Sequence, residues 1–232
     1  MSHGGRKGWR LDPGVIVPGG LASLSPDLGV RYLLIADPAL TAGRVVLEAA
    51  LHEYRRIPVG PYALLLDLAQ PGAQQPAQMV WETGHLVGEP FLGYWQAAGG
   101  VERLGYPISD ALEQPEGRVQ FFERALLLET GDGVERLPVG RLLLEAQGQM
   151  AISNEIAGPL QVAWEQAGGE QVLGPALSPA LEGGAGGQIQ YFEFGVLEMP
   201  RGGAAALGAA GRQLLEIRGL TEERQIVLLR SW

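Results

Sequence analysis

The stretch FLGYWQAAGGVERLGYPISDALEQPEGRVQFFERALLLE, residues 91–129, decides how the chain is read, because a diluted copy follows about seventy residues later. The positions that stay in register are Trp95 with Trp164, Gly99-Gly100 with Gly168-Gly169, Gly105 with Gly174, Ser109 with Ser178, Gln120-Phe121-Phe122-Glu123 with Gln190-Tyr191-Phe192-Glu193, and Gly140-Arg141 with Gly211-Arg212. Internal repeats of this length are typical of units too small to bury their apolar faces alone. We therefore expect an array of tandem units.

Each unit is predicted to contain one short helix. Phe91 and Trp95 are four residues apart, so they would share one face of a helix that begins after Pro90. Gly99 and Gly100 would supply the left-handed end of that helix.

A β-hairpin is predicted to follow the helix. Aromatic and leucine residues indicate a strand over 118–129, and the turn at 131–133 returns the chain as a strand over 134–139. In the second unit the hairpin is loosened by the glycine-rich tracts at 183–187 and 202–211. The expected class is mainly β with short helices, an α+β repeat, arranged like a propeller or closed by the C-terminal strand.

We expect four segments: a degenerate N-terminal repeat over 1–75, repeat units over 76–146 and 147–218, and a C-terminal strand or cap over 219–232. The strand-like end at 225–232 could pair with the N-terminal strand and close the array.

The segment 41–56 allows two interpretations. In the first it belongs to a degenerate repeat, because RIPVG at 56–60 resembles RLPVG at 136–140. In the second it is an amphipathic helix between strands at 30–36 and 62–68, which makes a small βαβ unit.

Composition excludes several classes of function. The formal net charge is −9 with no run of basic residues, so nucleic acid is not an expected partner. The chain has no cysteine, which excludes thiol nucleophiles, disulfides and Cys-ligated zinc. Apolar runs are too short for membrane insertion. Glycine and alanine abundance hints at a GC-rich genome and a thermophile.

No catalytic constellation is visible, and we predict no enzyme, metal or cofactor. The histidines are His3, His52 and His85, without the spacing of a zincin, and phosphate-binding and nucleophile-elbow motifs are missing. Glu123 and Glu193 occupy equivalent positions, which indicates a structural pairing with arginine rather than an acid and base pair.

Four segments carry a resemblance to a known family. WETGH (81–85), F-x-x-x-W-x-x-x-G-G (91–100), GYPIS (105–109) and VQFFERA (119–125) resemble the LGFP-like repeats found in tandem in secreted and cell-envelope proteins of bacteria. The second unit departs from the pattern at Pro175 and at Phe194-Gly195. The resemblance implies a non-catalytic module outside the cytoplasm or in the cell envelope, although residues 1–14 lack a signal-peptide segment and leave a cytoplasmic location open.

Residue roles follow from the family and from packing needs. The positions assigned to packing and turning are Trp95, Gly99, Gly100, Gly105, Pro107, Phe122, Trp164, Gly168, Gly169 and Phe192. The candidates for binding a cell-wall glycan or surface protein are Trp81, His85, Tyr94 and Tyr106, with a turn-capping role as the other interpretation of His85. The alternative function is a self-associating structural subunit of a surface layer or filament, with the chain as a homo-oligomer. An enzyme within 1–75 would rest on the βαβ interpretation alone.

Overall fold

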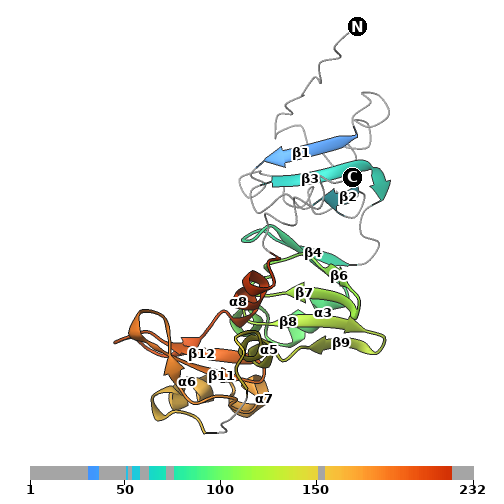
Figure 1. The fold of residues 1–232 in the computed structure, drawn as a ribbon. Helices are drawn as coiled ribbons and strands as arrows, with labels where there is room; N and C mark the ends of the chain where they lie inside the picture. The colour runs from blue at the N-terminus through green and yellow to red at the C-terminus, as the bar shows by residue number, and fades with distance from the viewer. Residues whose placement is uncertain are drawn as a thin grey trace. The chain divides into compact units, whose positions relative to one another are not determined.

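A computed structural model of the chain describes residues 31–36, 51, 54–57, 63–71, 76–150 and 155–220 (Figure 1). The chain divides into two compact units, Met1–Pro76 and Ala77–Trp232. The compact unit Ala77–Trp232, called the second unit from here on, contains both of the repeats identified in the sequence. The two repeats therefore fold together. Among the described residues, no helix is long and apolar enough to cross a bilayer.

The first unit contains a three-stranded antiparallel sheet. Its strands are β1 (Tyr32–Ala36), β2 (Tyr54–Ile57) and β3 (Ala63–Pro71), in the order β1-β3-β2. Strands expected at 30–36 and 62–68 are present, but they pair antiparallel, with Leu34 opposite Leu65. A βαβ unit requires parallel strands, so that interpretation was wrong. Leu51 is helical and buried, while residues 41–50 lie outside the described part of the chain.

The resemblance of RIPVG (56–60) to RLPVG (136–140) covers the end of one strand in each region. Arg56 lies in β2 and its counterpart Arg136 lies in the strand Gly133–Arg136. Beyond these positions the two regions differ, because residues 139–146 are helical whereas residues 63–71 form β3. The described strands of the first unit therefore do not follow the plan of a repeat.

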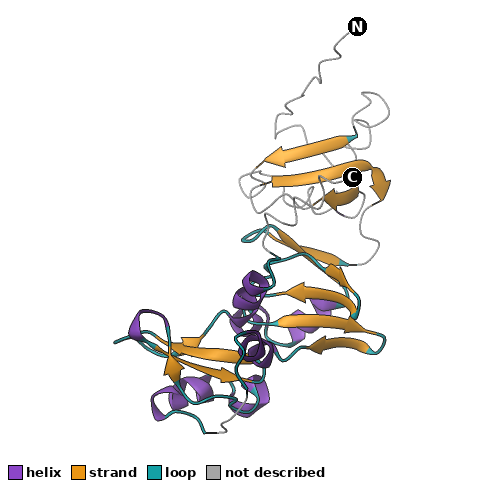
Figure 2. Cartoon of the chain, viewed as in Figure 1, coloured by secondary structure: helices purple, strands orange, loops and turns teal. Residues whose placement is uncertain are grey.

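The first repeat begins with a hairpin and continues into helices, a four-stranded sheet and a final helix (Figure 2). Its elements are β4 (Ala77–Val80), β5 (His85–Gly88), α3 (Phe91–Ala97), α4 (Gly100–Leu104), β6 (Leu112–Gln114), β7 (Gly117–Phe121), β8 (Leu126–Thr130), β9 (Gly133–Arg136) and α5 (Val139–Ala146). Sheet order β6-β7-β8-β9 makes it an antiparallel meander.

The second repeat follows the same plan from its first helical turn onward. Its elements are η2 (Gly158–Leu160), α6 (Gln161–Gln166), α7 (Gly169–Leu173), β10 (Leu181–Glu182), η3 (Gly184–Gly186), β11 (Gln188–Phe192), β12 (Gly195–Met199), β13 (Ala206–Leu207) and α8 (Ala210–Ile217). Its sheet is again a meander, β10-β11-β12-β13.

Each repeat, in its described residues, has three α-helices where one helix was expected. Gly99 has a φ of 100° and turns the chain out of α3, but α4 then starts at Gly100 instead of a loop. The strand expected over 134–139 ends at Arg136, and the helix α5 begins at Val139. Val139, Leu143 and Leu144 form one apolar face of this helix. The described residues consequently form a mixed α and β fold, and its four small antiparallel sheets support the expectation of a mainly β repeat in part.

The strand expected over 118–129 is a hairpin of two strands. Phe122 and Ala125 exchange backbone hydrogen bonds across a tight turn, so β7 and β8 run antiparallel. In the described part of the chain the sheets form neither a closed barrel nor a propeller. The strand expected at 225–232 falls outside the described residues.

Among the described residues of Ala77–Trp232, three apolar clusters hold the two repeats together. One lies within the first repeat around Phe91, Trp95 and Phe122, and another lies within the second repeat around Leu160 and Phe192. A third cluster is shared. Its buried members from both repeats are Ile108, Val119, Phe121, Leu126, Val139, Leu143, Leu144, Leu177, Tyr191, Val196, Ala210, Leu214 and Leu215.

The shared cluster forms because each repeat's last helix contacts the other repeat. Helix α5 of the first repeat packs on β11 and β12, helix α8 of the second packs on β7, and the two helices pack on each other (Figure 1). Such reciprocal contact is the pattern of a two-fold interface between identical subunits. The repeats thus form a closed pair within one chain.

Candidate functional site

Hydrogen bonds at the helix starts fix the joint between the repeats. The first N–H groups of α5, at Gly140 and Arg141, donate to the carbonyl oxygen of Glu193, at 3.2 and 3.4 Å. Gly211 and Arg212 of α8 donate in the same way to Glu123, at 3.0 and 3.2 Å. The first N–H groups of a helix have no partner within the helix, so each repeat completes the helix of the other.

The side chains of the same residues form matching ion pairs. Arg141 binds both carboxylate oxygens of Glu193, with a closest N···O distance of 2.6 Å. Arg212 contacts Glu123 at 3.2 Å. A hydrogen bond and the charge of Glu193 raise the pKa of Arg141. Both glutamates therefore have the structural pairing that their repetition predicted, although the partners lie on helices of the opposite repeat.

Glycine is required at both helix starts. A Cβ at Gly140 would collide with the carbonyl oxygens of Phe192 and Gly195, and a Cβ at Gly211 would collide with that of Phe122. These are backbone atoms of tight turns, which cannot move aside as a flexible side chain can. The repeated Gly-Arg pair is thus the contact surface of the joint.

Two arginines show how the second repeat compensates for a substitution. In the first repeat Arg124 donates to the carbonyls of Val101 and Glu102 in α4, both at 3.0 Å. The second repeat has Phe194 at the equivalent position. There Arg136 reaches across from β9, lies over the Phe194 ring at 5.4 Å, and donates to the carbonyl oxygen of Phe194 at 2.7 Å.

Arg136 also supports the helix α7 of the second repeat. Its guanidinium donates to the carbonyl oxygen of Val172 at 2.9 Å, in the last turn of α7. The negative end of the helix dipole lies there and stabilises a positive charge. Burial lowers the pKa of Arg136. The second repeat has Phe194 in place of Arg124, and Arg136 of the first repeat supplies the missing guanidinium there.

The four residues proposed from sequence as ligand contacts do not form an exposed platform. Trp81 and His85 are buried, with 9% and 4% of their surface exposed. His85 Nδ1 lies 3.3 Å from Asp110 Oδ1, and this carboxylate also accepts the N–H of Leu86. Tyr94 and Tyr106 are partly buried against the core of the first repeat.

The positions assigned to packing and turning lie where that role requires. Trp95, Phe122 and Phe192 are buried, and Trp95 donates from its indole nitrogen to the carbonyl oxygen of Gly105 at 3.1 Å. Trp164 packs partly buried against the core of the second repeat. The left-handed backbone at Gly99 is repeated at Gly168, with φ values of 100° and 101°.

Buried polar residues repeat as well. Gln120 and Gln190 are fully buried, and each ties its strand to a preceding segment through its side-chain amide. The hydroxyls of Ser109 and Ser178 accept the N–H groups of Phe121 and Tyr191 at 3.0 and 3.1 Å. The polar groups that the two repeats share therefore form hydrogen bonds within the fold, which we call the frame of the repeats.

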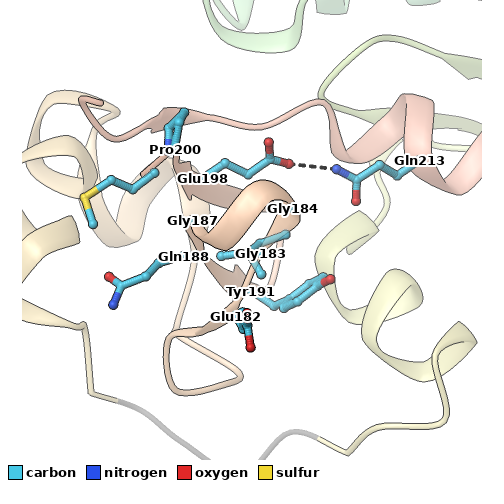
Figure 3. Close-up of a pocket in the computed structure, with 11 residues that line it drawn as sticks. Glu182, Gly183, Gly184, Gly187, Gln188, Tyr191, Glu198, Pro200 and Gln213 are labelled. Carbon is cyan, nitrogen blue, oxygen red and sulfur yellow. Dashed lines mark hydrogen bonds between the residues drawn. The ribbon is translucent and has the colours of Figure 1, made fainter. Parts of the chain in front are cut away.

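A cavity that the sequence did not indicate lies on the second repeat. It has a volume of about 410 Å³ and opens between the β10–β11 turn, β12 and the helix α8 (Figure 3). Its lining residues are Glu182, Gly183, Gly184, Gly187, Gln188, Ile189, Tyr191, Glu198, Met199, Pro200 and Gln213. The glycine tract at 183–187, interpreted from sequence as a loosened hairpin, forms one wall.

Polar side chains in this cavity are held in place by neighbours. Gln213 donates to a carboxylate oxygen of Glu198 at 2.7 Å (Figure 3), and Gln147 donates to the Tyr191 hydroxyl at 2.9 Å. Ligand pockets characteristically combine a concave apolar surface with a few oriented polar groups. This cavity is the best candidate site among the described residues.

The described residues contain no group of three His, Asp or Glu side chains placed to hold a metal ion. No protein-family model matches the chain, and no curated protein matches it.

Proposed function

We propose that the chain is a non-catalytic repeat module of the bacterial cell envelope that binds cell-wall glycan or a surface partner. One observation carries the proposal: residues shared by the repeats are used in packing and in the joint, whereas residues specific to the second repeat line an open cavity. A rigid frame with a separate polar cavity is suited to binding. The two equivalent glutamates, Glu123 and Glu193, form ion pairs with arginines, which supports a structural role for them.

The envelope location rests on the resemblance to LGFP-like repeats. That resemblance concerns the Trp, Gly-Gly and aromatic positions, which lie in the frame of both repeats. A module of this kind would keep an attached protein at the cell wall without acting on it.

A pull-down on insoluble bacterial cell wall tests this proposal. The purified full chain should sediment with the wall, and soluble wall fragments should release it in proportion to their concentration. An unrelated acidic protein of similar size, included because the chain carries a net charge of −9, should remain in solution. A chain that stays in the supernatant with that control would contradict the proposal.

Self-association as a structural subunit is the second candidate, and one observation favours it. Strand β1 lies at an edge of the described sheet of the first unit, and Leu34 on it is 61% exposed. Exposed apolar edge strands pair readily with other chains. Sedimentation velocity over a range of concentrations should then show assembly that Leu34→Lys abolishes; a monomer at every concentration rejects this candidate.

A further inference from the structure

We propose that the cavity of the second repeat is the glycan site, and that it takes a saccharide that carries hydrogen-bond donors and no negative charge, with an amino sugar as the best fit. This inference rests on the proposed function and names its site and ligand chemistry. The cavity differs in chemistry from the same place in the first repeat.

Three positions change from apolar to polar between the repeats. The strand pairings place Ile189 opposite Glu198 where the first repeat has Val119 opposite Leu128. By the same register, Tyr191 replaces Phe121, and Gln213 of α8 replaces Leu142 of α5. In the first repeat these apolar residues belong to the shared cluster or pack against it. At Glu198 and Gln213 the second repeat therefore has polar groups that line a cavity in place of apolar packing, whereas Tyr191 stays in the shared cluster and adds a hydroxyl group.

Two further changes open the second repeat at the same place. In the first repeat an ion pair between Arg118 and Glu129 links the ends of β7 and β8. The equivalent residues of β11 and β12 are Gln188 and Met199, which form no such pair. The turn before β11 is also longer by one residue and consists mainly of glycine, and a Cβ at Gly184 would meet nothing within 4 Å.

The cavity offers hydrogen-bond acceptors in excess. Glu182 and Glu198 contribute carboxylates, whose oxygen atoms accept hydrogen bonds and donate none. A ligand that donates to them forms charge-assisted hydrogen bonds. None of the lining residues is Lys, Arg or His. An anionic ligand would therefore be repelled.

A saccharide meets these requirements. Its hydroxyl groups donate hydrogen bonds, and the ammonium of an amino sugar would form a charge-assisted bond with Glu198, whose carboxylate Gln213 already orients. Ile189 and Pro200 supply apolar surface for the C–H face of the sugar ring. The cavity volume of about 410 Å³ lies within the range of small-ligand sites.

Calorimetric titration of the full chain tests the ligand chemistry. The probes are chitosan oligosaccharides, which carry free amino groups, chitin oligosaccharides, which carry acetylated ones, and polygalacturonate oligosaccharides, which are anionic. We expect the order of affinity chitosan, then chitin, with no binding of polygalacturonate. Equal or tighter binding of polygalacturonate, or binding of none of the three, would overturn the proposal.

Variants locate the site. Glu198→Gln keeps the shape of the side chain and removes its charge, so chitosan binding should weaken about tenfold through the loss of a charge-assisted hydrogen bond. The matched control is Glu113→Gln, because Glu113 has the position in β6 that Glu182 has in β10, and it should leave affinity unchanged. Equal affinity for wild type and Glu198→Gln would contradict the assignment.

The double variant Glu198→Leu/Gln213→Leu installs the residues that the first repeat carries, and its folding is checked by thermal unfolding. Used in the cell-wall pull-down, it separates the two proposals. Retention of wild type and loss of the variant support the site. Equal retention of both rejects the site while the proposed function stands, and no retention of wild type rejects the function whatever the titrations show. If this variant does not fold, the Glu198→Gln titration decides.

Discussion

The two repeats of Ala77–Trp232 have the same frame and different surfaces. Trp, Gly-Gly, Gln, aromatic and Gly-Arg positions take equivalent places in both, whereas the β7–β8 end of the first repeat is closed by Arg118 and Glu129 and the β11–β12 end of the second contains a cavity. The comparison teaches that repetition marks the residues by which the chain holds itself together. Divergence marks surface that packing does not use, and there we propose that a ligand binds.

The joint also shows that the repeats are not interchangeable. Arg136 crosses from the first repeat to the second to support α7, while the equivalent position in the second repeat is Leu207, which pairs with Leu197 in its own sheet. The interface between the repeats is therefore reciprocal at the helices α5 and α8, whereas the Arg136 contact runs only from the first repeat to the second.

The largest effect is expected at the glycines of the joint. Gly140→Ala and Gly211→Ala should each lower the free energy of unfolding by about 3 kcal/mol, because the new Cβ meets backbone carbonyls that cannot retreat. Urea unfolding measures this. Gly131→Ala is the control, since a Cβ there meets nothing within 4 Å, and its effect should be within about 0.5 kcal/mol. Equal stability of all three variants would show that the helices do not dock as described.

The next effect concerns Arg136. Arg136→Leu, which copies Leu207, should cost about 2 kcal/mol because the carbonyls of Val172 and Phe194 lose their charged donor. Arg124→Leu removes a similar pair of bonds inside the first repeat, one of them exposed, and should cost less. Thermal unfolding of both variants gives the order. The reverse order would mean that Arg136 does not join the repeats.

A smaller effect is expected from Tyr191→Phe. The change makes the second repeat match Phe121 of the first and removes the hydrogen bond to Gln147, at a cost of about 1 kcal/mol. Chemical denaturation is precise enough to detect it. Phe121→Tyr offers the converse test, because a hydroxyl placed in the shared cluster should destabilise by at least as much. A stabilising Phe121→Tyr would undermine the contrast between the repeats.

The smallest effect is in the ion pairs. Double-mutant cycles should give a coupling of about 1 kcal/mol for Arg141 with Glu193 and about 0.3 kcal/mol for Arg212 with Glu123, because the first pair is bidentate and the second is longer and more exposed. Adding salt should reduce the second coupling more. Equal couplings at both ends would indicate a symmetric joint.

The sequence predicted the frame better than the joint. Register between the copies identified Trp95, Phe122 and their counterparts, because apolar and glycine positions that repeat must serve packing and turning. It missed the second helix at Gly100, since a Gly-Gly pair is read as a helix end although it can also link two helices. It also missed the turn at Phe122, because a run of aromatic and leucine residues looks the same in one strand or in two.

The crossing of helices could not be derived from the repeat. Glu123 and Glu193 are equivalent, as are Arg141 and Arg212, so register alone fits pairing within a repeat as well as between repeats. The cavity was hidden for a different reason. Polar residues scattered at Tyr191, Glu198 and Gln213 acquire meaning only when strand pairing and helix packing bring them together.

Native-state hydrogen exchange on the full chain, with and without Gly140→Ala, tests most directly whether the repeats form one closed pair. Although the substitution lies in the first repeat, the amides of β11 and β12 in the second should lose as much protection as those of β7 and β8, because the shared cluster unfolds as one unit. Loss of protection confined to the first repeat, with β11 and β12 unchanged, would contradict the closed pair and return the chain to an array of independent units.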